Sequence, residues 1–110
     1  MTTLEIKHQV PVTVETVQIQ LPYYYQTGKY CKHHCCITEE KALIRMYQIA
    51  GWHIETKFFD DEDDIVAHLQ SEMKDTTYCV LDKELFEAKF TKAHRDIYYT
   101  LNHYLRPDEK

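Results

Sequence analysis

The first 60 residues alternate between apolar and polar positions with the period of two that is typical of half-buried β-strands. Apolar residues fall on even positions from Ile6 to Val14 and on odd positions from Val17 to Tyr25. Because a slip of one residue would turn the second set to the opposite face, the pattern predicts a bulge or turn at Glu15-Thr16. Pro11 and Pro22 lack a backbone N–H, which places these strands near a sheet edge or at unpaired positions.

The next segments contain one predicted hairpin and one ambiguous stretch. Residues 26–29, QTGK, predict a short loop with glycine at positive φ, and residues 30–37 resume an extended pattern. In residues 38–51, TEEKALIRMYQIAG, Thr38 as a cap and Gly51 just past the end favour a helix. A TEEK turn followed by a strand with apolar residues on both faces fits the same letters.

The second half of the chain predicts two helices. Residues 52–59 alternate like a strand, and Asp60 or Asp61 then caps a helix with an apolar stripe at Ile65, Val66, Leu69 and Met73. Residues 76–81 predict a short strand. Asp82 caps the longest helix, which ends before Pro107 and has its stripe at Phe86, Phe90, Ala93, Ile97, Leu101, Tyr104 and Leu105. We therefore expect an α+β fold: an antiparallel sheet of about four to five strands with a short acidic helix and a long C-terminal helix packed on one face.

The composition predicts one soluble domain. A chain of 110 residues with two glycines and three prolines fits a single folded domain over residues 1–110. Neither an apolar run long enough to cross a bilayer nor the pattern of a signal peptide occurs, so we expect an intracellular protein. In such a compartment the four cysteines are expected to remain reduced.

The negative charge is concentrated in one segment. The net charge is −5, and residues 60–75 contain seven acidic residues against one basic residue, while the rest of the chain is close to neutral. The basic patch typical of nucleic-acid-binding proteins is missing, so we expect no direct nucleic-acid binding. A confined acidic segment instead indicates a partner with a basic surface.

Sequence signatures of enzymes and cofactor sites are missing. The chain has neither a phosphate-binding nor a dinucleotide-binding glycine loop, and Ser71 is its single serine. The run DDEDD lacks the glycine and the closing glutamate of a calcium loop. Asp60 and Asp64 form a carboxylate pair, but at this spacing they are typical of a solvated helix start. We therefore expect a protein that is not an enzyme and needs no cofactor.

The stretch YCKHHCC at residues 30–36 is the strongest candidate for a metal site. On an extended strand alternate residues face opposite sides, so its cysteines and histidines cannot all bind one ion. Cys31, His33 and Cys35 share a face, and His53 or Cys79 can complete a tetrahedral zinc site. Because a second pair of ligands is missing, we favour free thiols without metal, and a small zinc-binding module remains the alternative function.

Tyrosines next to this stretch predict an interaction surface. Tyr23 and Tyr25 are in phase with Leu21 and are expected at a core or rim, whereas Tyr24 is expected to face outward. Tyrosine is enriched at protein interfaces because it brings a large area at low rotamer cost. An acidic first turn can also simply stabilise its own helix, by about 0.3–1 kcal/mol per charge. The predicted partner-binding residues are Asp60, Asp61, Glu62, Asp63, Asp64, Tyr23, Tyr24, Tyr25 and Tyr30.

Two segments carry a resemblance to other proteins. QIQLPYYYQTGKYCKHHCCITEEK and LDKELFEAKFTKA, about half of the chain, resemble small uncharacterised proteins from phages and mobile elements of gut bacteria. The resemblance implies a third strand at residues 41–49, because those proteins have a strand after an acidic turn. It also implies a cytoplasmic, non-enzymatic binder of a host protein, acting as a stoichiometric inhibitor of a nucleic-acid-handling or defence protein in the manner of anti-CRISPR proteins. The acidic helix at residues 61–73 lies outside the shared pattern.

Overall fold

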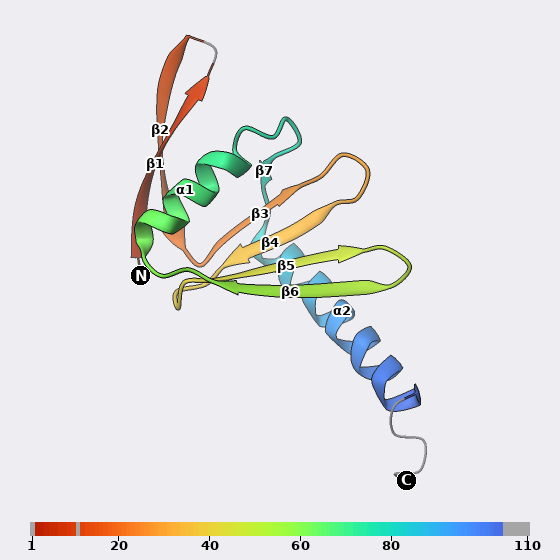
Figure 1. Ribbon diagram of the computed structural model, residues 1–110. Coiled ribbons are helices and arrows are strands. Elements are labelled where there is room, and N and C mark those ends of the chain that lie inside the picture. The colour runs from red at the N-terminus through yellow and green to blue at the C-terminus, as the bar shows by residue number, and fades with distance from the viewer. Residues whose placement is uncertain (1, 11, 105–110) are drawn as a thin grey trace.

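The computed structural model describes residues 2–10 and 12–104, with side chains described for residues 2–9 and 12–94. Strands β1 and β2 form a two-stranded sheet, and five strands in the order β6-β5-β4-β3-β7 form the main sheet (Figure 1). All strand pairs are antiparallel, which confirms the α+β class. The elements are β1 (Thr2–Val10), β2 (Thr13–Leu21), β3 (Tyr23–Thr27), β4 (His33–Ile37), β5 (Ala42–Gln48), β6 (Trp52–Phe58), α1 (Glu62–Glu72), β7 (Cys79–Val80) and α2 (Lys83–Tyr104).

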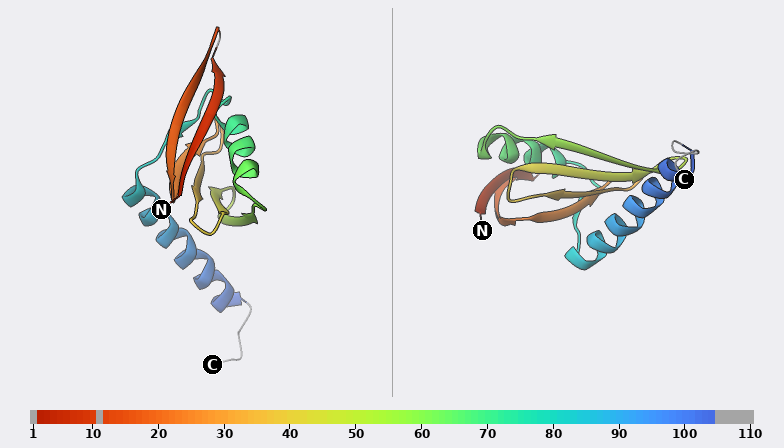
Figure 2. Two further views of the ribbon diagram at one scale, coloured as in Figure 1. Left: turned by 90° about the vertical axis from the view of Figure 1, so that its left-hand side faces the viewer. Right: turned by 90° about the horizontal axis from the view of Figure 1, so that it is seen from below.

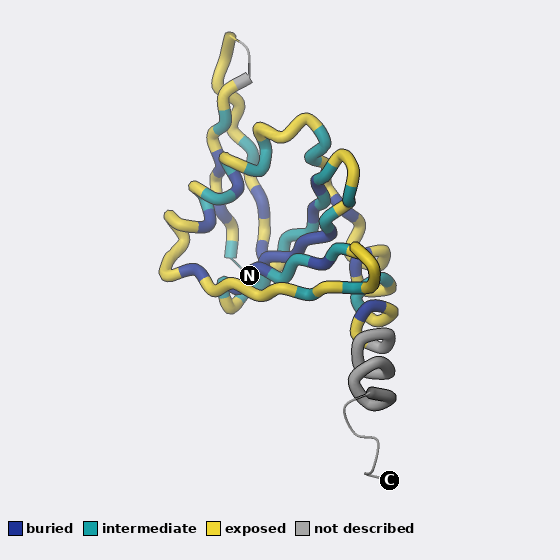
Figure 3. Tube along the Cα trace, turned by 45° about the vertical axis from the view of Figure 1, so that its right-hand side comes forward, coloured by how far each residue is buried: buried dark blue, intermediate teal, exposed yellow. Residues whose placement is uncertain are grey.

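The phase change in the apolar pattern comes from a hairpin turn, and the predicted bulge at Glu15-Thr16 is wrong. Strands β1 and β2 pair from Val10 with Thr13 back to Thr2 with Leu21, so the chain reverses direction between Val10 and Thr13. In this register even positions of β1 lie opposite odd positions of β2, which brings Ile6 to the same face as Val17 and Ile19, whereas Val14 pairs with Gln9 and is exposed. The distal end of this hairpin extends away from the main sheet and is exposed (Figure 3).

The second apolar run, from Val17 to Tyr25, belongs to two strands. Pro22 separates β2 from β3 and lies at the cis peptide bond Leu21-Pro22. Since Pro22 has no N–H to donate to a ladder, it fits the junction where the chain leaves one sheet and enters the other.

Residues 42–48 form a strand, in agreement with the strand alternative. Thr38 closes a hairpin turn: its N–H donates to the Ala42 carbonyl at 2.9 Å, and its Oγ1 accepts from the Ala42 N–H at 3.2 Å. Lys41 occupies the turn at a φ of 65°. A threonine that was expected to cap a helix therefore closes a turn, because β5 finds ladder partners on both sides in β4 and β6.

The two helices lie on opposite faces of the main sheet, which corrects the prediction that they share one face (Figure 2). The reason is the pleat, which turns alternate side chains to opposite faces. Tyr25 and Leu43 belong to the core beneath α1, whereas Cys36 and Met46 belong to the core beneath α2. Both faces of the sheet are apolar in the middle, so each needs a helix to cover it.

The helix boundaries follow the predicted caps. Asp61 caps α1 by accepting from the Asp64 N–H at 3.0 Å, and Asp82 accepts from the Leu85 N–H at 3.3 Å at the start of α2. Ile65 and Leu69 of the predicted α1 stripe are fully buried. In α2, buried contacts with the sheet are made by Phe86 and Ala93, with Phe90 partly buried beside them. Beyond Ala93 the predicted stripe, Ile97, Leu101, Tyr104 and Leu105, lies outside the described side chains.

Candidate functional site

A polar cluster lies between α1 and the main sheet, centred on Glu72. Glu72 Oε1 accepts a hydrogen bond from Arg45 Nη2 at 2.7 Å and another from the Tyr25 hydroxyl at 2.9 Å. His68 Nε2 lies 3.0 Å from the same hydroxyl and 3.6 Å from Glu72 Oε1. Arg45 Nη1 donates to His33 Nδ1 at 3.1 Å. We call these five residues the Glu72 cluster.

Strand register and helix spacing bring the Glu72 cluster together. Tyr25, Cys35 and Arg45 lie opposite one another on the adjacent strands β3, β4 and β5, so their side chains form a row on one face. His68 and Glu72 are four residues apart on α1 and therefore share the helix face that covers this row.

Burial determines the protonation states in this region. It raises the pKa of the Tyr25 hydroxyl far above its ordinary value, so that the phenol stays a hydrogen-bond donor. Burial also lowers the pKa of His33 and of His68, which keeps both imidazoles neutral at pH 7. The Cys35 thiol is fully buried, and burial raises its pKa to about 11. A thiolate is the reactive form of cysteine, so the protonated Cys35 thiol is a poor nucleophile. The hydrogen bonds of the Glu72 cluster instead hold α1 against the sheet, and we call this arrangement a latch for α1.

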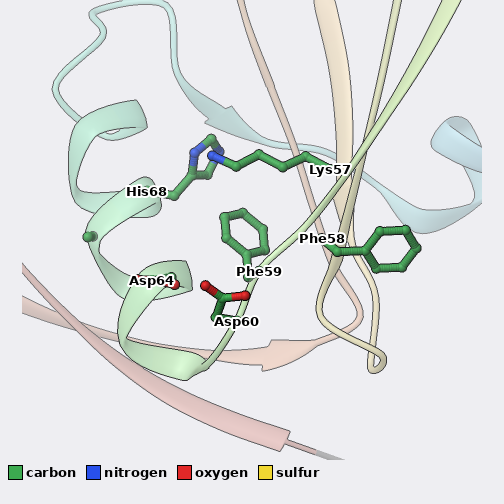
Figure 4. Close-up of a pocket in the computed structure, with 7 residues that line it drawn as sticks. Lys57, Phe58, Phe59, Asp60, Asp64 and His68 are labelled. Atoms are coloured by element: carbon green, nitrogen blue, oxygen red, sulfur yellow. The ribbon is translucent and has the colours of Figure 1, made fainter.

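Two adjoining cavities lie beside the Glu72 cluster, between α1 and the hairpin formed by β5 and β6. The first, of about 420 Å³, is lined by Leu43, Arg45, Glu55, Thr56, Lys57 and His68. The second, of about 390 Å³, shares Lys57 and His68 with the first and reaches the acidic segment at Asp60 and Asp64 (Figure 4). The Lys57 ammonium lies 5.3 Å from the centroid of the Phe59 ring, so a cation already occupies this apolar ring face.

The acidic segment, residues 60–64, is exposed at every position. Asp61 uses one carboxylate oxygen to cap α1. Among the side chains of residues 2–9 and 12–94, no salt bridge joins any of the five carboxylates to a basic group. These charges are therefore available to solvent or to a partner.

The structure divides the predicted tyrosine contacts. Tyr30 is 93% exposed, whereas Tyr25 has no exposed surface, so its predicted role as an exposed contact is wrong. Tyr23 is half-buried, and its hydroxyl is hydrogen-bonded to that of Tyr78. Tyr24, expected to face outward, is partly buried against Phe86 of α2, with ring centroids 5.3 Å apart. These three tyrosines are packed because helices cover both faces of the sheet.

The acidic segment and Tyr30 do not form one surface. Tyr30 lies in the loop between β3 and β4, and Figure 1 places this loop at the opposite end of the sheet from the start of α1. The stretch YCKHHCC, residues 30–36, does not lie at a sheet edge, because its strand β4 lies between β3 and β5 in the sheet. Any combined use of the two features requires a partner that spans the sheet.

The three candidate zinc ligands occupy different environments. Cys31 lies in the loop before β4, because the strand begins at His33 and not at Tyr30, and its thiol is 3.7 Å from the Gln48 carbonyl. His33 contacts the Arg45 cation, and Cys35 is fully buried. Among the described residues no group of three or more His, Cys, Asp or Glu side chains is placed to hold a metal ion. The four cysteines are free thiols.

The sequence interpretation did not identify the Glu72 cluster. Arg45, His68 and Glu72 come from a strand and a helix whose contact depends on how α1 docks, which the sequence does not specify. One local signal was present, since His68 and Glu72 have the i, i+4 spacing of a helix pair. A second missed feature is a row of stacked rings across β4, β5 and β6. The ring centroid of Tyr47 lies 4.7 Å from that of His33 and 5.0 Å from that of His53.

Comparisons of the chain with models of protein families, with curated proteins and with solved structures found no match. Over residues 2–10 and 12–104, neither helix has the length and apolar character needed to span a membrane.

Proposed function

We propose that this chain is a non-enzymatic protein-binding module whose acidic segment occupies a basic surface on a partner protein. One observation carries the proposal: five consecutive carboxylates, at residues 60–64, are all exposed, and none is paired with a basic side chain of the described chain. Asp61 supplies the cap of α1, and Glu62, Asp63 and Asp64 lie in its first turn, where negative charge also favours the helix N-terminus. The other four charges exceed what the cap requires.

The charge distribution favours association with a cationic groove. The segment lies at the start of α1, in a chain whose other residues together are close to neutral, so it accounts for almost the whole net charge. Such a confined field accelerates encounter with an oppositely charged surface, and the effect weakens as salt is added. A groove that normally holds nucleic acid has the complementary charge.

The cavity beside the acidic segment offers a place for a basic side chain of the partner. Asp60 and Asp64 line it together with Phe59 and Ala67, so carboxylates adjoin an aromatic ring and an apolar wall. An arginine would place its guanidinium at the carboxylates and its stem along the ring. Because the Lys57 ammonium already covers one face of this ring, the arginine stem would pack on the ring surface that Lys57 leaves open.

The biological role that follows is stoichiometric inhibition. A module that fills a basic groove excludes nucleic acid from it without catalysis. The proposed partner is a nucleic-acid-handling or defence protein of a bacterial host, as the resemblance to proteins of phages and mobile elements implies.

A charge-neutral variant of the acidic segment tests the proposal. The variant Asp60→Asn, Glu62→Gln, Asp63→Asn keeps the cap at Asp61 and removes three exposed charges. Its matched control, Glu40→Gln, Glu84→Gln, Glu87→Gln, removes three exposed charges elsewhere. Both variants have a net charge of −2 in place of −5. The three immobilised proteins are used to capture partners from a bacterial lysate, which are quantified by mass spectrometry.

We expect a captured protein that the wild type and the control retain and that the acidic-segment variant loses. With that protein purified, the association rate of the variant is expected to fall and to depend less on salt. The captured protein should also release bound nucleic acid when the wild-type chain is added. Equal capture by all three proteins would refute a role for the acidic segment.

A further inference from the structure

Strand β6 forms an unprotected edge of the main sheet. It has seven residues, without proline, and no strand among the described residues pairs with its outer side. The opposite edge is different, because β7 has only two residues. Proteins commonly protect long edge strands with bulges, prolines or covering segments, since unpaired backbone groups readily pair with another strand. The outer side of β6 therefore needs an explanation.

The ladder with β5 shows which backbone groups of β6 point outward. Phe59 N–H donates to the Lys41 carbonyl, and Ile49 N–H donates to the Gly51 carbonyl, each at 2.9 Å. In an antiparallel ladder hydrogen-bonded pairs alternate with non-hydrogen-bonded pairs, so the odd residues of β6 bond to β5. The N–H and C=O groups of the even residues, including Ile54, Thr56 and Phe58, point away from the sheet.

One antiparallel register of two β6 strands pairs the outward backbone groups, sets opposite charges against each other and brings apolar side chains together. With Thr56 opposite Thr56 of a second copy, the outward groups of the even residues pair, and Glu55 lies opposite Lys57 twice. The same register sets partly buried Ile54 opposite Phe58, which is 72% exposed in the single chain. We infer that two copies of this chain associate through β6 in this register, forming a two-fold dimer with one continuous sheet.

Neighbouring registers are less favourable. Moving one strand by two residues in one direction sets Glu55 opposite Glu55, and like charges directly opposite destabilise a strand pair. Moving it by two residues in the other direction sets Lys57 opposite Lys57 and Phe58 opposite Thr56, so like charges again lie directly opposite each other. Charge complementarity therefore selects the register with Thr56 opposite Thr56, in which Phe58 also gains an apolar partner in Ile54.

Helix α2 is placed to support this dimer. It covers the face of the sheet that carries Trp52 and Ile54, and it crosses behind β6 and continues past the edge (Figure 1). A two-fold axis perpendicular to the sheet would carry this overhanging part of α2 across the face of the second copy.

Sedimentation of the full chain over a range of concentrations tests the inference. We expect a reversible dimer for the wild type. Thr56→Pro removes an outward N–H without removing a bond to β5, and it should weaken the dimer by at least about tenfold. The control Thr56→Val keeps the N–H and the branched shape and should stay dimeric. A wild type that remains monomeric at every concentration, or a Thr56→Pro variant that dimerises as well as the wild type, overturns the inference.

A cross-linking variant keeps the test decisive if Thr56→Pro does not fold. In a hydrogen-bonded antiparallel pair the two Cα atoms lie about 5.5 Å apart, within the range of a disulfide. Thr56→Cys should therefore form an intermolecular disulfide on mild oxidation, whereas Ser71→Cys, at an exposed position on α1, should not. Equal cross-linking of the two variants contradicts the proposed register. Dimerisation does not need the partner of the acidic segment, so this result stands apart from the capture experiment.

Discussion

The two faces of the main sheet are covered by helices that are held in different ways. Under α2 the contacts are apolar, from Phe86 and Ala93 to Cys36 and Met46. Under α1 an apolar core is joined by the charged and hydrogen-bonded Glu72 cluster. Apolar burial is non-directional, whereas a carboxylate that binds an arginine and a phenol fixes one position of the helix.

This difference separates two kinds of stabilisation in one small chain. We expect substitutions under α2 to act through the volume removed, and substitutions under α1 to act through the polar group left unpaired. The acidic segment and the cavities adjoin α1. The helix that directional hydrogen bonds hold in position is therefore the one that carries the proposed binding surface.

The largest effect is expected under α2. Phe86→Ala removes a ring that is 4% exposed and should lower the free energy of unfolding by about 3–5 kcal/mol. Phe86→Leu keeps most of the volume and should cost less than about 1.5 kcal/mol. Urea unfolding followed by circular dichroism measures both. Equal losses for the two variants would show that volume does not determine the stability of this face.

Under α1 a substitution with almost no change of volume should be nearly as damaging. Glu72→Gln leaves the Arg45 cation without its counter-ion, at side-chain exposures of 18% for Arg45 and 19% for Glu72. We expect a loss of about 2–3 kcal/mol, below the cost for a fully buried pair because water reaches both groups. Glu62→Gln, exposed on the same helix, should change stability by less than about 0.5 kcal/mol in the same urea titration. If Glu72→Gln leaves the free energy of unfolding unchanged, the Glu72 cluster does not hold α1 in place.

A smaller effect is expected at the start of α1. Asp61→Ala removes the cap and should cost about 1 kcal/mol, whereas Asp63→Ala removes a neighbouring charge without a cap and should cost less than about 0.5 kcal/mol. Thermal unfolding of both variants at equal salt measures the difference. If both variants lose the same stability, the negative charge and not the capping hydrogen bond stabilises the start of α1.

The smallest effect is expected from pH. Burial, followed by Lys89 and Lys32, lowers the pKa of His34 below the ordinary 6.5. The unfolded chain then binds more protons than the folded chain, so stability falls as the pH falls below about 6.5 and levels off below the folded pKa. His34→Gln should remove part of this dependence when unfolding free energies at about pH 8 and about pH 5 are compared. If the free energy of unfolding of His34→Gln depends on pH as strongly as that of the wild type, His34 titrates in the folded chain as it does in the unfolded chain.

Local signals in the sequence predicted much of the secondary structure. Alternation identified the extended segments but not the turn between β1 and β2, and the predicted caps, Asp60 or Asp61 and Asp82, marked the helix starts because a cap needs only the next turn of its own chain. The local signals failed at Thr38, where a helix cap and a hairpin turn use the same side chain. Only pairing of β5 with strands on both sides distinguished the two.

The sequence by itself determined that this chain forms an antiparallel sheet, two capped helices and one concentrated acidic segment, since each depends on neighbours along the chain. Tertiary structure alone decided that the helices cover opposite faces, that Tyr25 is buried and that Glu72 binds Arg45. Tertiary structure also left β6 as the open edge. These features depend on which surfaces meet after the chain has folded back on itself, and a pattern with a period of two or of three to four residues specifies the face of each element but not its neighbour.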